Sequence, residues 1–93
     1  MRDLVFETEN YKLETEWFEN KPFLHCEVYK WNISIYKKLV KDWNGFLSIL
    51  KDNQINEWYS IIPKGDSKLL KFQKLFGLQI LKETETHYLM RGE

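Results

Sequence analysis

The stretch Lys68-Leu69-Leu70-Lys71-Phe72-Gln73-Lys74-Leu75-Phe76-Gly77-Leu78 combines a short amphipathic helix, a stop signal and the start of a strand. Leu69, Phe72, Leu75 and Phe76 recur at helical spacing and predict the face that packs on the core, with Lys64, Lys68 and Lys71 outside. Asp66 or Ser67 can cap the first turn. Gly77 can adopt the left-handed conformation that ends many helices. The stretch therefore predicts a helix over residues 68–76 that leads directly into a strand.

Two stretches upstream of this helix alternate in polarity, as half-buried strands do. Residues 11–17 place Tyr11, Leu13, Thr15 and Trp17 on one face of a strand. Residues 23–31 place Leu24, Cys26 and Val28 on an apolar face, with His25, Glu27 and Tyr29 opposite. Between them, Glu19-Asn20-Lys21-Pro22 is typical of a turn. A hairpin is therefore expected, and the apolar run Leu4-Val5-Phe6 predicts a strand before it.

The spacing of apolar residues then changes from two to about 3.6 and predicts the longest helix, over residues 33–51. Asn32 can cap this helix, whereas Gly45 costs about 1 kcal/mol relative to alanine and favours a kink. Residues 57–62 are rich in aromatic and β-branched side chains and predict a buried strand. Two further strands are expected over residues 78–82 and 87–91. The expected core stripe of the long helix consists of Tyr36, Leu39, Val40, Trp43, Leu47 and Leu50.

The predicted order is β-β-β-α-β-α-β, with a further strand at the end. It indicates an α+β, α/β-like fold, in which two helices cover a mixed sheet of about five to six strands. Because a helix joins the third and fourth strands, these two can lie parallel. No repeat or linker-like segment interrupts the chain, so residues 1–93 are expected to form a single domain.

Composition narrows the class of protein. Apolar residues make up 43% of the chain and aromatic residues 16%, which is enough for one compact core. No apolar run approaches the roughly 18 residues that span a bilayer, and Met1-Arg2-Asp3 does not begin a signal peptide. We therefore expect a soluble cytoplasmic protein with no membrane partner. Cys26 is the only cysteine, so no internal disulfide or thiolate metal cluster can form and no metal site is expected.

The net charge of zero hides an uneven distribution along the chain. Residues 1–27 hold three basic and seven acidic side chains, whereas residues 28–74 hold nine basic and four acidic ones. A neutral chain has no broad attraction for nucleic acid, so such a partner is not expected. A local basic surface on the middle third stays open as an alternative.

The order of elements, together with the junction Phe72-x-x-x-Phe76-Gly77-Leu78, resembles the C-terminal two-thirds of the GNAT acyltransferase fold. The resemblance covers residues 11–91 and makes residues 23–30 the central strand and residues 68–76 the last helix. The chain also looks like the small GNAT-related proteins of bacteriophages. Family members normally carry a strand and one or two helices ahead of this region, and dimerisation could cover the face that those helices shape.

The resemblance implies a coenzyme A site, but this sequence departs from the family's pattern at two elements of that site. The family's glycine-rich loop binds pyrophosphate at a helix N-terminus, whereas the matching segment, residues 29–36, contains no glycine. The family's tyrosine, which protonates the departing thiolate, is matched by Gln73, which cannot donate a proton at ordinary pH. Asp66 stands where the family usually has an asparagine. If coenzyme A binds at all, the residues that the resemblance implies around it are Trp31, Asn32, Ile33, Ser34 and Lys37.

Three functions follow as hypotheses. The first is a non-catalytic, GNAT-like phage-type protein without a cofactor, located in the host cytoplasm or the virion. It would act through contact with a second copy or another protein, as a virion component or a host-factor binder. Tryptophan and tyrosine dominate interface energetics, so the candidate contact residues are Trp17, Phe18, Tyr29 and Trp31.

The second hypothesis is a minimal acetyl-coenzyme A-dependent N-acetyltransferase in which Glu27 or His25 acts as the base. The third is an unrelated small α+β protein that binds nucleic acid through its helical lysines, Lys37, Lys38, Lys41, Lys64, Lys68 and Lys71.

Overall fold

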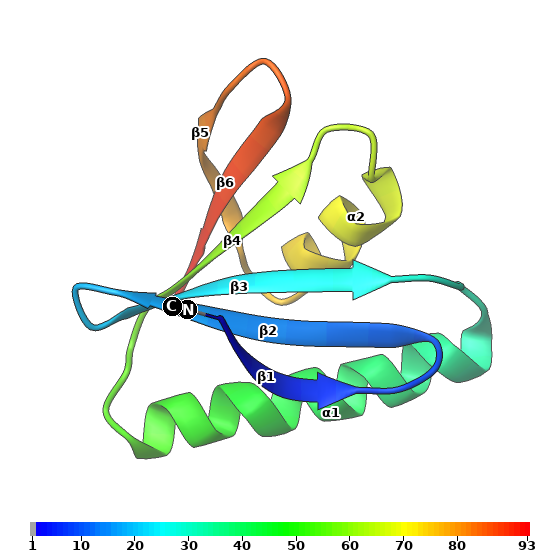
Figure 1. Ribbon diagram of the computed structural model, residues 1–93, viewed down its shortest axis with the longest axis horizontal. Helices are drawn as coiled ribbons and strands as arrows, with labels where there is room; N and C mark the ends of the chain where they lie inside the picture. Colours follow the sequence, from blue (N-terminus) through cyan, green and yellow to red (C-terminus); the bar gives the residue numbers. More distant parts are fainter. Residues whose placement is uncertain (1) are drawn as a thin grey trace.

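The computed structural model describes residues 2–93 and contains six strands and two helices (Figure 1). The strands β1, β2 and β3 come first, then the helix α1, the strand β4, the helix α2, and the strands β5 and β6. This is the predicted order, and the α+β class is confirmed. The bounds are Arg2–Glu7 for β1, Tyr11–Phe18 for β2, Lys21–Val28 for β3, Ile33–Asp52 for α1, Trp58–Pro63 for β4, Ser67–Leu75 for α2, Gln79–Glu83 for β5 and His87–Gly92 for β6.

The strands form one mixed sheet in the order β1-β2-β3-β4-β6-β5. Strands β3 and β4 are parallel, as their helical crossover predicts, and the other neighbours are antiparallel. The parallel pairing is short, because only Phe23 and Leu24 of β3 are matched with Tyr59 and Ser60 of β4. Beyond these residues β3 and β4 diverge, and the gap between them widens in Figure 1.

The β2–β3 hairpin turns through two residues, Glu19 and Asn20, whose φ angles are 50° and 65°. Positive φ at both central positions gives the turn a twist that matches the flanking strands. Phe18 is then paired with Lys21, and Pro22 lies within β3 rather than in the turn. This register fixes which side chains of β2 and β3 share a face.

Both helices pack on the same face of the sheet. Trp43 of α1 contacts Phe72 of α2 at 5.4 Å between ring centroids and Phe76 at 6.0 Å. One buried cluster contains residues of both helices together with alternate residues of β2, β3, β4 and β6, among them Leu13, Leu24, Ile62 and Met90. The opposite face of the sheet, here called the open face, has no helix of residues 2–93 packed on it.

Helix α1 begins where the sequence predicts, since the side chain of Asn32 accepts a hydrogen bond from the backbone N–H of Ile35 at 2.9 Å. The helix continues through Gly45 without a break. Its buried side is broader than the predicted stripe: Ile35 and Phe46 are buried, whereas Tyr36 is 36% exposed. The reason is that α1 also packs beside β2, where the Tyr11 hydroxyl donates a hydrogen bond to Asp42.

Helix α2 is capped by Asp66, whose carboxylate accepts from the N–H of Leu69, and it stops before Gly77, whose φ is 82°. The predicted core stripe was wrong at one position, because Leu75 is 71% exposed. The buried arc runs from Phe72 toward Gln73, which is fully buried. Leu75 follows Phe72 by three residues, which places it round the helix on the side away from Gln73.

Neither helix is long and apolar enough to cross a membrane.

Candidate functional site

The open face carries a row of aromatic side chains in its centre, where a sheet face in water is usually polar. Phe18 of β2 contacts Phe23 of β3 with ring centroids 6.4 Å apart. Phe23 in turn stacks on Tyr59 of β4 at 5.0 Å. We call Phe18, Phe23 and Tyr59 the aromatic row. It crosses β2, β3 and β4 at the place where the two central strands are still paired.

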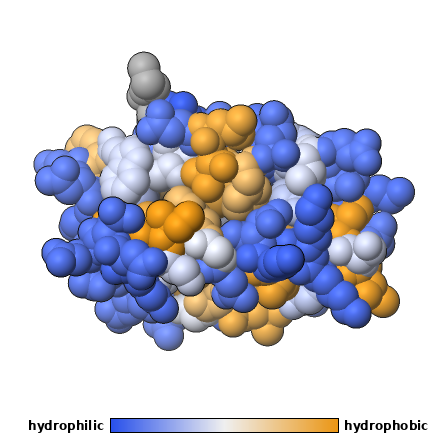
Figure 2. All heavy atoms as spheres, turned by 90° about the horizontal axis from the view of Figure 1, so that it is seen from below, coloured by the Kyte–Doolittle hydropathy of each residue, from blue (hydrophilic) through white to orange (hydrophobic). Residues whose placement is uncertain are grey.

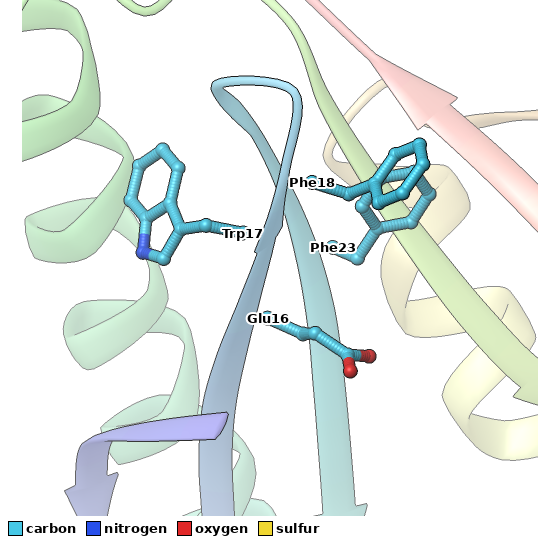
Figure 3. A pocket seen from close by; sticks show the side chains of 4 residues that line it. All are labelled: Glu16, Trp17, Phe18 and Phe23. Carbon is cyan, nitrogen blue, oxygen red and sulfur yellow. The ribbon is translucent and has the colours of Figure 1, made fainter. Parts of the chain in front are cut away.

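The end of the row lies beside a hollow of about 430 Å³ near the hairpin turn, lined by Glu16, Trp17, Phe18 and Phe23. Figure 3 shows Phe18 and Phe23 on one side of the hairpin and Trp17 on the other, toward α1. This follows from the alternation of side chains along a strand. Phe18 is 62% exposed and Trp17 44%, so both rings expose apolar surface, on different sides of the hairpin.

A charged cluster borders the aromatic row. Arg91 of β6 donates a hydrogen bond to Glu57 at 2.7 Å, and Lys21 lies 3.4 Å from the other oxygen of the same carboxylate. The hydrogen bond from Arg91 lowers the pKa of Glu57, with Lys21 contributing. Lys21 also lies over the ring of Tyr59, 5.8 Å from its centroid. The row thus has a polar rim, an arrangement typical of interfaces.

A second hollow, of about 450 Å³, lies where β3 and β4 diverge. His25 Nε2 is 3.1 Å from Glu16 Oε1, so the carboxylate orients the imidazole. Both predicted bases, His25 and Glu27, belong to this hollow. Its lining consists of Arg2, Glu16, His25, Cys26, Glu27, Ile61, Pro63 and His87.

Cys26 borders this hollow but is only 7% exposed, as its place on the apolar face of β3 predicts. Burial raises the pKa of the thiol to about 12, and the charges of Asp66 and Glu27 act in the same direction. A thiol that stays protonated is a poor nucleophile. Cys26 is therefore a packing residue.

The five residues that the resemblance implies around coenzyme A do not line the hollow between β3 and β4. The side chain of Asn32 caps α1, and the ring of Trp31 packs against Phe72 with centroids 6.1 Å apart. Ile33, Ser34 and Lys37 are exposed along the first turns of α1. Gln73 does not line the hollow either, since its side chain is fully buried.

The four predicted contact residues fall into two groups. Trp17 and Phe18 are the last two residues of β2, next to the hairpin turn, whereas Tyr29 and Trp31 follow the other end of β3. Sequence reasoning missed Phe23 and Tyr59, which complete the aromatic row. The signal was available for Phe23, because strand alternation places it on the same face as His25. No such signal existed for Tyr59, since its pairing with Phe23 depends on the register between β3 and β4.

Within residues 2–93, no three histidine, cysteine or acidic side chains are arranged to hold a metal ion. Comparisons with protein-family models, with curated proteins and with solved structures found no match for the chain. The open face and the two hollows are the features of the described residues that bear on function.

Proposed function

We propose that this protein is a non-catalytic, GNAT-like protein of the kind found in bacteriophages, and that it acts through protein contact made by its open face. Its place would be the host cytoplasm or the virion, and its partner a host factor, another virion component or a second copy of itself. The observation that carries the proposal is the aromatic row of Phe18, Phe23 and Tyr59 on a sheet face without covering helices.

Several properties of this surface suit an interface. Phe18 exposes 62% of its surface, and Ile61, on the same face of β4, exposes 36%. Aromatic anchors with a polar rim contribute most of the binding energy in many protein complexes. Phe23 is partly exposed and stacks on Tyr59, which is only 9% exposed; this buried support holds the Phe23 ring, so little side-chain entropy would be lost on binding.

The test uses two matched substitutions of exposed apolar residues. Phe18→Glu puts a charge on the aromatic row, whereas Leu75→Glu puts the same charge on α2 at a side chain that is 71% exposed. We expect Phe18→Glu to abolish self-association in light scattering, or capture of the partner by the purified protein, and Leu75→Glu to leave both intact. Equal behaviour of the two variants would count against the open face as the contact surface.

A minimal acetyl-coenzyme A-dependent N-acetyltransferase is the second candidate. The divergence of β3 and β4 favours it, because the hollow there contains His25, oriented by Glu16, and Glu27. The absence of a glycine loop in residues 29–36 and the burial of Gln73 speak against it.

Calorimetric titration with acetyl-coenzyme A separates the two functions. On the contact proposal we expect binding no tighter than about 1 mM, which corresponds to about −4 kcal/mol. Micromolar binding that is weakened by His25→Gln would support the transferase instead.

A further inference from the structure

The outward sides of α1 and α2 carry lysine side chains without acidic partners. Lys37 and Lys41 of α1 and Lys68 and Lys71 of α2 are all exposed. The ion pairs formed among residues 2–93 involve none of these four. Their charges are therefore available to a ligand.

The two helices pack against each other, and aromatic rings lie at the seam between them, beside these lysines. The rings of Trp31 and Tyr36 both contact Phe72 of α2, at 6.1 and 5.9 Å between centroids. On α2, Lys68 lies one turn before Phe72, and Lys71 lies three residues after Lys68 on the same side of the helix; on α1, Lys37 and Lys41 lie one turn apart on the same side. We call this region the seam surface, made of Trp31, Tyr36, Lys37, Lys41, Lys68 and Lys71.

Lysines outnumber acidic groups on the two helices, since residues 33–52 and 66–75 hold seven lysines and three aspartates. Asp42 accepts a hydrogen bond from Tyr11, and Asp66 caps α2 through the N–H of Leu69. Most other acidic residues are in the first 27 positions, which carry a net charge of −4, whereas residues 28–74 carry +5. Figure 2, which looks onto the molecule from the side of α1, shows a largely hydrophilic surface with separate hydrophobic patches. The overall charge of zero thus conceals a basic helical side.

We propose that the seam surface binds single-stranded nucleic acid, with the lysines on phosphates and bases stacked on Tyr36 and Trp31. Tyr36 is 36% exposed and Trp31 is half-buried, so both rings can offer part of a face or edge to a base. Interleaved lysines and aromatic rings are the features that bind single strands without sequence preference. An acidic protein would pair with the lysines alone, whereas a single strand would also use the exposed parts of the two rings, and the bases of a duplex are already stacked. This surface is separate from the open face, so the inference does not depend on the proposed function.

The experiment measures fluorescence anisotropy of a labelled oligothymidylate of about 16 nucleotides, titrated with the full chain. Four phosphate contacts give a slope of log affinity against log salt of about −3, or a fall of roughly 50-fold between about 50 and 200 mM salt. The double variant Lys37→Gln/Lys68→Gln should reduce the slope to about half. The matched double variant Lys74→Gln/Lys82→Gln, which removes the same charge outside the seam surface, should keep the slope. Tyr36→Leu should weaken binding about tenfold at constant salt, with the fold checked by circular dichroism.

Three results would overturn the inference. One is the absence of any salt-dependent anisotropy change at about 50 mM salt. Another is an equal loss of affinity in the two double variants, which would assign binding to overall charge. The third is equally tight binding of polyglutamate, or displacement of the oligonucleotide by micromolar coenzyme A, which would assign the surface to an acidic protein or to a nucleotide cofactor.

Discussion

Gln73 offers the sharpest test of the packing described above. Its side chain is fully buried on α2, and neither its amide nitrogen nor its amide oxygen has a hydrogen-bond partner among residues 2–93. In proteins, a buried amide without a partner costs about 1–3 kcal/mol. Methionine has nearly the same length, no branch at Cβ and a similar helix propensity. We therefore expect Gln73→Met to raise the free energy of unfolding by about 1–3 kcal/mol.

The measurement is urea unfolding followed by tryptophan fluorescence, since Trp43 and Trp58 are both buried in the core. With a slope of about 1–1.5 kcal/mol per molar urea for a small domain, the midpoint should rise by roughly 1–2 M. Leu69→Ala serves as the control, because removing a fully buried leucine from the same helix should lower stability by about 2–5 kcal/mol. A loss of more than about 1 kcal/mol in Gln73→Met would refute the reasoning, since it would mean that the amide is satisfied, for example by a buried water.

Further predictions concern the cysteine, two glycines and a helix cap. Burial raises the pKa of Cys26 to about 12; the folded-state value lies above the unfolded one, so this group's contribution to stability is complete below about pH 8.5 and declines as pH rises toward 12. The urea midpoint of unfolding should therefore fall as the pH is raised from about 8.5 toward 12. A thiol reagent at neutral pH should label Cys26 only after unfolding. Gly45→Ala should stabilise α1 by about 0.5–1 kcal/mol, because a Cβ there meets no atom within 4 Å, whereas Gly77→Ala should destabilise by about 1 kcal/mol because φ is 82°. Thermal melts check this: the melting temperature should rise for Gly45→Ala and fall for Gly77→Ala, and a change in the same direction for both variants would contradict the assigned backbone conformations. Asn32→Ala should cost about 1 kcal/mol, because Asn32 caps α1, and Asn32→Ser should restore most of that loss; no change in either variant would count against the cap.

Much of the fold could be predicted from local signals. The alternation in residues 11–17 and the caps Asn32 and Asp66 act within a few residues of themselves, and the structure has them where the sequence places them. Gly77 stops α2 with a positive φ, as expected. The parallel pairing of β3 with β4 followed from the length of the connection between them.

What could not be predicted depends on long-range packing. The rotation of α2, which exposes Leu75 and buries Gln73, is set by the contacts of Phe72 with Trp31, Tyr36 and Trp43. A buried glutamine also contradicts hydropathy, so no periodicity rule would place it in the core.

The candidate site was predicted only in part for the same reason. His25 and Glu27 were found as neighbours on β3, but Arg2 and His87 join them from distant strands. The aromatic row needed the register of three strands, which the positions of Phe18, Phe23 and Tyr59 in the sequence do not reveal.

Site-specific photo-crosslinking tests the central claim most directly. A photoreactive phenylalanine analogue replaces Phe18 on the open face in one variant and Leu75 on α2 in another, and both exposed positions tolerate the larger ring. After irradiation in the cells that naturally contain the protein, we expect a discrete adduct from position 18, with the mass of a dimer or of a single partner protein, and none from position 75. Adducts of the same mass from both positions, or from position 75 alone, would contradict the assignment of protein contact to the open face.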